Sequence, residues 1–94
     1  MPYRDDGEAV ARANGTRYGL GGSVWGADVA AANALAQRLV SGTVWVNDHA
    51  SLTGAPFGGF KESGIGRELG VADVTTFTEQ QTLKLAKSGT KSRL

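Results

Sequence analysis

The sequence predicts an α/β fold, made of a βαβ unit, a long glycine-rich loop, a short helix and a C-terminal edge strand. Two observations support this prediction. Apolar residues at helical spacing over 29–40 lie between two short apolar segments, at 22–26 and 42–47. Residues 48–70 then show no hydrophobic period and hold six of the chain's 14 glycines, which indicates a loop.

The first predicted element is a helix over residues 5–14. Asp5 or Asp6 can cap its N-terminus, and alanines together with Val10 form a small apolar face. The pair Asn14-Gly15 is typical of a helix end.

The βαβ unit follows this helix. Residues 22–26 form the first short strand, Asp28 caps a helix over 29–40, and residues 42–47 form the second strand, which is rich in β-branched and aromatic residues. Because a helix connects them, the two strands should be parallel and the crossover right-handed.

After the loop, residues 71–77 are expected to form a short helix. Residues 78–86 alternate in polarity, with Leu83 and Leu85 on one side, as an edge strand would. Residues 87–94 form a polar tail. A sheet of two or three strands has two open edges, so it normally belongs to a larger structure.

The composition excludes several classes of site and partner. None of the 94 residues is a cysteine, which excludes disulfides, thiolate metal sites and a thiol nucleophile. The 10 basic and 9 acidic residues give a net charge of +1, so a nucleic acid partner is not expected. No apolar stretch approaches the roughly 18–20 residues of a membrane helix, and the polar first residues do not form a secretory signal. We therefore expect a soluble, cytoplasmic protein.

Several residues could carry chemistry, and each has a plainer interpretation. Residues 64–70, GIGRELG, imitate a dinucleotide-binding fingerprint, but no strand precedes them and no carboxylate follows at the required distance, which favours a tight turn. His49 has no neighbouring nucleophile, so a structural role is the default. Phe57, in an aperiodic loop, either lines a pocket or packs in the core. Trp25 and Trp45 are expected to pack in the core.

Four segments together resemble the C-terminal end of the NAD(P)-dependent aldehyde dehydrogenase superfamily. They are YGLGGSVWG (18–26), SGTVWVND (41–48), APFGGFKESGIGRELG (55–70) and FTEQQTLKL (77–85). The resemblance covers residues 2–86, and the PFGG-K-SG-GRE string is highly specific. It implies that residues 1–86 are a partial C-terminal region of such an enzyme, with 80–86 as its oligomerisation strand.

The resemblance implies roles for individual residues. Phe57 matches an aromatic residue that lines the family's substrate tunnel. Residues 48–53, with His49 and Leu52, match the family's variable substrate entrance, where an aromatic residue is often found. Glu68 matches a glutamate proposed for proton relay or for an internal cation site. Glu79 matches a glutamate that braces the subunit interface together with an arginine like Arg67.

The resemblance also implies what the chain lacks. The family's catalytic cysteine, general-base glutamate, oxyanion-hole asparagine and NAD-binding domain all lie upstream of the matched region. We therefore expect no catalytic, cofactor-binding or metal-ligating residue here. We also expect no cofactor for the chain alone, although the family oxidises aldehydes to carboxylic acids with NAD or NADP.

Three functional hypotheses follow from the resemblance. In the first, the chain is a truncated aldehyde dehydrogenase segment, inactive alone, that forms a homo-oligomer by strand exchange. Residues 80–86 of one chain then add to residues 42–47 of another, most simply in a homodimer. In the second, it is an interaction module that docks on full-length aldehyde dehydrogenase subunits. In the third, it is one part of a split enzyme whose other segments lie on another polypeptide.

Overall fold

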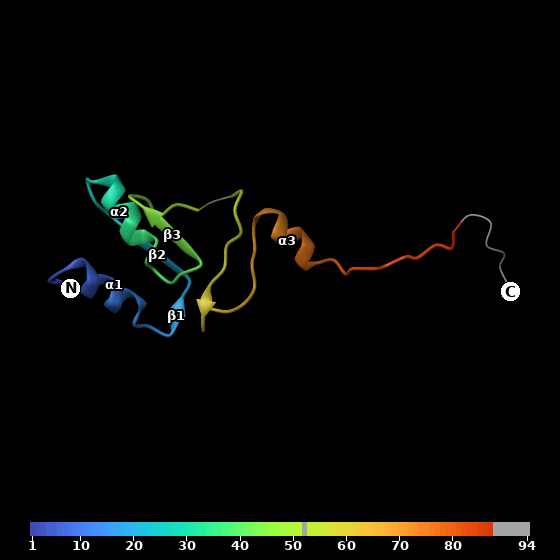
Figure 1. Cartoon of the computed structure of the whole chain (residues 1–94), viewed down its shortest axis with the longest axis horizontal. Coiled ribbons are helices and arrows are strands. Elements are labelled where there is room, and N and C mark those ends of the chain that lie inside the picture. The colour runs from blue at the N-terminus through green and yellow to red at the C-terminus, as the bar shows by residue number, and fades with distance from the viewer. Residues whose placement is uncertain (52, 88–94) are drawn as a thin grey trace.

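The chain folds into a body of helices and short strands, followed by an extended arm (Figure 1). The computed structural model describes residues 1–51 and 53–87. We call residues 78–87 the arm; they lie in no helix or strand. The radius of gyration is 21.8 Å and the principal extents are 76 × 26 × 19 Å. A compact domain of this length has a radius of gyration of about 13 Å, so the structure is strongly elongated.

The βαβ unit predicted from the sequence forms the centre of the body. Strands β2 (Gly21–Val24) and β3 (Thr43–Val46) are parallel and pair along their whole length. Helix α2 (Val29–Ala36) connects them and lies against both. Its Ala32 and Ala36 are the only buried hydrophobic residues among those the structure describes. The predicted α/β class is confirmed, and its core is very small.

Helix α2 begins where the sequence predicts and ends four residues early, at 36 instead of 40. A carboxylate oxygen of Asp28 accepts a hydrogen bond from the Ala31 N–H at 3.1 Å and caps the N-terminus. Beyond the other end, the Asn14 amide donates to the Arg38 carbonyl at 2.9 Å and accepts from the Val40 N–H at 2.8 Å. These bonds occupy backbone groups that a longer helix would use, so the helix stops short.

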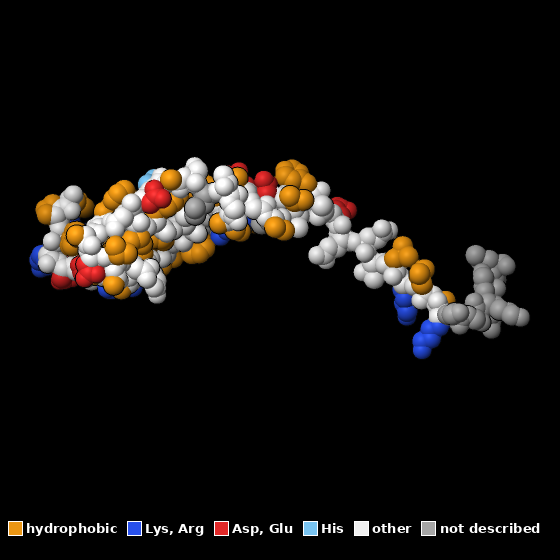
Figure 2. Space-filling view, turned by 90° about the horizontal axis from the view of Figure 1, so that it is seen from above, with side chains coloured by type: hydrophobic (Ala, Val, Ile, Leu, Met, Phe, Trp, Pro, Cys, Tyr) orange, Lys and Arg blue, Asp and Glu red, His pale blue; other side chains and the backbone are white. Residues whose placement is uncertain are grey.

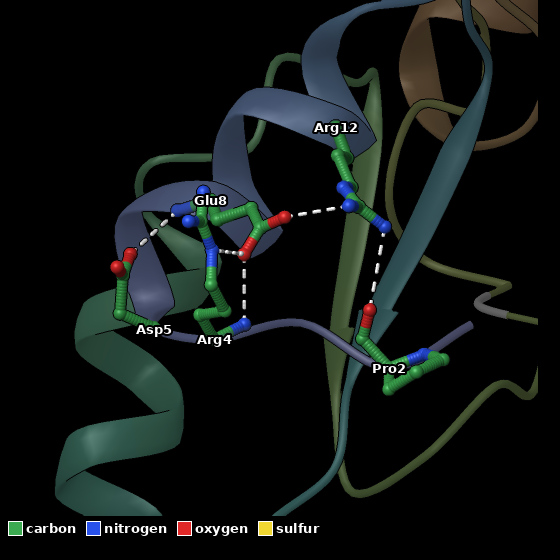
Figure 3. Close-up of polar contacts among 5 residues, drawn as sticks. All are labelled: Pro2, Arg4, Asp5, Glu8 and Arg12. Carbon is green, nitrogen blue, oxygen red and sulfur yellow. Dashed lines mark hydrogen bonds and ion pairs between the residues drawn. The ribbon is translucent and has the colours of Figure 1, made fainter.

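Helix α1 (Asp6–Asn14) confirms the first predicted helix, with Asp5 as its N-cap. Asp5 accepts a hydrogen bond from the Glu8 N–H at 2.8 Å. The Glu8 carboxylate accepts another from the Arg4 backbone N–H at 2.8 Å and pairs with the guanidinium groups of Arg4 and Arg12 (Figure 3). The chain before the helix is thereby tied to its first turn.

These contacts predict that helix α1 weakens in acid. The hydrogen bond from the Arg4 backbone N–H lowers the pKa of Glu8 below its ordinary 4.5, and the Arg4 and Arg12 side chains add to this against an opposing effect of desolvation. Because the pKa of Glu8 is lowered in the folded chain, its contribution to stability is complete above about pH 4.5 and is lost as the pH falls through the lower value.

We expect the helicity measured by circular dichroism to decrease in this acid range. In the Glu8→Gln variant, most of this acid-induced decrease should be absent. Glu62→Gln is the matched control, because the Glu62 carboxylate pairs only with the exposed Arg17, at 3.4 Å. An acid transition of equal size in Glu8→Gln and in the unaltered chain would contradict the assignment.

A second, antiparallel sheet pairs β1 (Tyr18–Gly19) with β4 (Phe60–Lys61), and the sequence pattern does not predict it. Each strand has only two residues, too few to show an alternating period. The Lys61 ammonium donates to the carbonyls of Asn14 at 2.9 Å and Thr16 at 3.1 Å. A cation is favourable at a helix C-terminus, so this sheet holds the glycine-rich loop against the end of α1.

Asn47 fastens the exit of β3 to the exit of β2. Its amide oxygen accepts from the Gly26 N–H at 2.7 Å, and its amide nitrogen donates to the Gly26 carbonyl at 2.9 Å. The Asn47 backbone is left-handed, with φ of 52°, a conformation that asparagine tolerates better than most residues. The chain turns here from the sheet into the loop.

The C-terminal part of the prediction is only half right. Helix α3 (Gly70–Thr76) confirms the predicted short helix. The strand predicted over residues 78–86 does not form in the described chain, where these residues are extended without a partner. A strand needs a neighbour for its backbone N–H and C=O groups, and the arm runs away from the body in both views (Figures 1 and 2). The alternating pattern therefore predicted the extended conformation but not the partner.

Much apolar surface is uncovered in the single chain. Trp25 is 66% exposed. Val71 in α3 is 81% exposed, and Phe77, the residue after α3, is 86% exposed. Leu83 and Leu85 of the arm are 73% and 79% exposed. Figure 2 shows hydrophobic side chains over the body, over α3 and along the arm. None of the described helices is long and apolar enough to cross a membrane.

Candidate functional site

A cavity of about 250 Å³ lies between strand β3 and the glycine-rich loop. Thr43 and Trp45 line it from the strand, and because they are two residues apart they share one face of β3. The loop supplies the opposite side. The ring-bearing and polar residues that line the cavity are Thr43, Trp45, His49, Ser51, Phe57 and Glu68.

Trp45 and His49 form an aromatic pair on the cavity wall. Their ring centroids are 4.4 Å apart and the ring planes are tilted by 40°. The Trp45 indole N–H donates to the Ala50 carbonyl at 2.7 Å, which fixes the orientation of the indole. The Asp48 carboxylate accepts from the His49 and Ala50 N–H groups at 2.7 and 3.1 Å and shapes the turn that holds the imidazole over the indole.

Phe57 and Glu68 meet although they lie at opposite ends of the glycine-rich loop. The Phe57 N–H donates to the Glu68 carbonyl at 2.7 Å, and the Glu68 N–H donates to the Phe57 carbonyl at 2.8 Å. This antiparallel bridge brings an aromatic ring and a carboxylate to the same cavity. Phe57 is half-buried and Glu68 is exposed.

Glycines allow the loop to approach strand β3 closely. A Cβ atom added to Gly42 would lie 1.6 Å from the Gly58 carbonyl oxygen, so the two backbones can cross there only if residue 42 is glycine. Next to this crossing, the Arg67 guanidinium donates to the carbonyls of Gly59 at 3.0 Å and Gly66 at 2.8 Å. Arg67 therefore fixes the loop from within.

The structure brings three of the predicted site residues together and leaves a fourth apart. Phe57 and Glu68 line the cavity beside β3, and Arg67 lines a neighbouring cavity together with both of them. Arg67 binds loop carbonyls, and no ion pair joins it to Glu79 in the described part of the chain. Glu79 lies exposed on the arm, so its predicted interface role stays a prediction. Leu52 lies outside the described residues.

Trp45 lines the cavity although the sequence predicts it in the core, because tryptophan in an apolar strand usually packs there. His49, for which a lone histidine predicts a structural or solvated role, lies in the segment 48–53 that the resemblance matches to the family's substrate entrance. The positions of Trp45 and His49 in the sequence could have indicated that their rings lie close together. Trp45 lies on the face of β3 opposite to Val44 and Val46, and the histidine follows it by four residues.

Residues 64–69 form an irregular loop that leads into α3, and the turn that the plainer interpretation of GIGRELG predicts lies just before them, at residues 62–63. Gly64 and Gly70 have positive φ values of 109° and 65°, which glycine adopts readily. The preceding strand β4 pairs antiparallel with β1, whereas a dinucleotide fingerprint follows a strand of a parallel sheet. Among the described residues, no group of three or more histidines and carboxylates is placed to hold a metal ion.

Comparison with known proteins identifies the fold and its relatives. The model of the aldehyde dehydrogenase family matches residues 1–83. The chain is 45% identical over 86 residues to phenylacetaldehyde dehydrogenase of Pseudomonas fluorescens, covering 90% of this chain and 17% of that enzyme. It is 46% identical over 82 residues to the NADP(+) succinate-semialdehyde dehydrogenase of Deinococcus radiodurans, covering 86% of this chain and 17% of the relative.

A crystal structure of Mycobacterium tuberculosis aldehyde dehydrogenase complexed with NAD+ superposes with a TM-score of 0.84 at 43% identity. The superposition covers 97% of this chain and 19% of that structure. The chain thus spans about a sixth of the length of the curated relatives, 17% in each case.

These comparisons correct the expectation that no cofactor is involved. The Mycobacterium structure that shares this fold holds NAD+, and the Deinococcus relative takes NADP(+) by its name. The expectation rested on the resemblance, in which the NAD-binding domain lies upstream of the region that this chain matches. The chain covers 19% of its NAD+-bound neighbour, so the residues present here do not decide whether a cofactor is used.

Proposed function

Because the chain belongs to the aldehyde dehydrogenase family, we propose that it supplies one wall of the substrate pocket and the C-terminal assembly segment of an enzyme that oxidises aldehydes with NAD(P). The cavity between β3 and the glycine-rich loop carries this proposal. It joins Phe57, which matches the family's tunnel aromatic, to Glu68, which matches the family's relay glutamate.

The residues of the cavity suit the binding and proton-transfer parts of this reaction. Oxidation of an aldehyde to a carboxylate consumes one water, passes a hydride to NAD(P)+ and releases protons. Apolar and aromatic side chains, Phe57 and Trp45 among them, can hold the substrate's side chain. The exposed Glu68 carboxylate at the same cavity is placed to accept a proton.

The chain should not perform the oxidation by itself. The family's covalent step needs a cysteine thiol to attack the aldehyde carbon, and this sequence contains no cysteine. The proposed activity therefore requires residues supplied by another part of an aldehyde dehydrogenase.

The arm supports a further part of the proposal, that the chain associates with another through residues 80–86. Beyond Thr78, whose N–H donates to the Thr75 carbonyl, the described arm lies in no sheet and exposes Leu83 and Leu85. Among the described strands, β3 pairs with β2 alone. An extended segment can add to such an edge through backbone hydrogen bonds. A second copy is the proposed partner, and a full-length family subunit is the alternative.

A chimeric enzyme tests the proposed function. Residues 1–86 of this chain would replace the matching segment of the Pseudomonas phenylacetaldehyde dehydrogenase. We expect NAD(P)-dependent aldehyde oxidation with kcat/KM within about tenfold of the parent, which corresponds to about 1.4 kcal/mol of transition-state stabilisation. The isolated 94-residue chain should give no NAD(P)H above the buffer rate.

The control is the parent enzyme with the segment deleted, which should be inactive. A chimera that assembles and melts like the parent but oxidises no aldehyde would contradict the proposal. Turnover by the isolated chain would contradict the requirement for residues from elsewhere.

A further inference from the structure

Resting on the proposed function, we propose that the Trp45–His49 pair selects aldehydes whose side chain is a neutral aromatic ring, and that His49 is a specificity-determining residue. The proposal follows from the geometry, size and charge of the cavity, none of which depends on where the reacting thiol lies.

The aromatic pair is built before any ligand arrives. The indole of Trp45 cannot turn away without breaking its 2.7 Å hydrogen bond to the Ala50 carbonyl. The backbone turn that carries His49 is held by two hydrogen bonds to Asp48. A wall that is already ordered costs a ligand little conformational entropy, so ring contacts contribute their full strength.

Phe57 supplies a third ring to the same cavity from the loop side. Aromatic rings attract one another in offset or edge-to-face geometry at centroid distances of about 4.5–7 Å, with about 0.5–1.5 kcal/mol beyond simple burial. The Trp45–His49 pair itself, at 4.4 Å and 40°, leaves ring edges and faces for a ligand. A flat ring between β3 and the loop would contact both sides.

The volume fits one ring. An apolar cavity of about 150 Å³ is enough to bind benzene, and this one measures about 250 Å³. The difference leaves room for a short chain between the ring and the aldehyde carbon. The volume is below the roughly 300–1,000 Å³ of sites for larger ligands.

The charge of the cavity opposes anionic substrates. Glu68 is the one carboxylate among the described lining residues, and neither a lysine nor an arginine is among them. An aldehyde that carries its own carboxylate would meet a like charge without a fixed cation to offset it. The cavity therefore favours a phenyl-substituted aldehyde over a semialdehyde with a carboxylate.

The first test is binding of inert probes to the full chain. A Trp25→Phe background leaves Trp45 as the one tryptophan, whose fluorescence reports binding. We expect 2-phenylethanol to bind about two- to tenfold more tightly than 2-cyclohexylethanol, the ratio that about 0.5–1.5 kcal/mol of ring contact gives. Phenylacetate, the anion with the same ring, should bind more weakly than 2-phenylethanol. His49→Ala should remove the aromatic advantage, and His49→Phe should keep it.

The second test uses the chimera, and it decides the question if the isolated chain shows no cooperative unfolding transition. In His49→Ala, kcat/KM for phenylacetaldehyde should fall about two- to tenfold, with kcat/KM for hexanal unchanged. Gln37→Ala, at an exposed residue that does not line the cavity, should change neither value.

Equal affinity for both ring probes with unaltered His49, or equal changes for both aldehydes in His49→Ala, would overturn the inference. Because the unaltered chimera would still oxidise hexanal in that case, such a result would leave the proposed function standing. A chimera inactive on every aldehyde would refute the proposed function instead.

Discussion

Replacing Gly42 with alanine is expected to destabilise the body by about 3 kcal/mol or more, at the upper end of the cost of overpacking. The added Cβ would lie 1.6 Å from the Gly58 carbonyl oxygen and 2.7 Å from its carbonyl carbon. Both are backbone atoms, so no side chain can move aside to relieve the clash. A loss of this size is a large share of the 5–15 kcal/mol that stabilises a whole domain.

The matched control for this substitution is Gly54→Ala in the same glycine-rich loop. A Cβ there would have no atom within 4 Å, and the residue does not need a positive φ. Urea denaturation of the chimera should show a much lower midpoint for Gly42→Ala and little change for Gly54→Ala. Equal midpoints for the two variants would mean that β3 and the loop do not cross as described.

The Gly42→Ala variant should also lose activity in the chimera. Gly42 immediately precedes β3, and Gly58 immediately follows Phe57. Separating the two backbones would therefore move Phe57 away from Trp45 and open the cavity between them. The loss should affect aromatic and aliphatic aldehydes alike, which distinguishes it from the selective effect expected of His49→Ala.

The double substitution Leu83→Asp/Leu85→Asp is expected to abolish association through the arm. Both leucines lie on one side of the alternating segment and are exposed in the single chain, so a second chain is proposed to cover them. Two buried carboxylates without partners would cost several kcal/mol at such an interface. Hydrogen exchange of the backbone amides of residues 80–86 measures the effect directly, because strand pairing protects these amides.

Thr82→Asp/Ala86→Asp is the matched control, with the same charge change in the same segment but on the opposite side of the alternation. It should retain protection of residues 80–86, while the leucine variant should exchange at the rate of a free chain. Protection that survives in both variants would show that the leucines do not face a partner.

The sequence is informative where structure depends on neighbours along the chain. The caps Asp5 and Asp28 and the apolar stripe of α2 act within one or two helical turns, so the pattern locates α1 and α2 and the parallel strands before and after α2. The end of α2 is different. It is set by Asn14, 24 residues away from Arg38, and no local pattern records such a contact.

The candidate site is only partly predictable for the same reason. Phe57 and Glu68 could be assigned because their motif resembles a family in which both positions have roles. The bridge between Phe57 and Glu68 and the ring contact between Trp45 and His49 both arise from a loop that folds back onto β3. The C-terminal strand was mispredicted because no described segment of the chain lies beside residues 78–86 to pair with them.

The solution mass of the full chain at micromolar concentration, by size exclusion with light scattering, tests whether a second chain pairs with residues 80–86 of the arm. We predict a sharp species with the mass of two or more chains, with a cooperative unfolding transition. A sharp, folded species with the mass of one 9.8 kDa chain would contradict this pairing, because residues 80–86 would then need no partner.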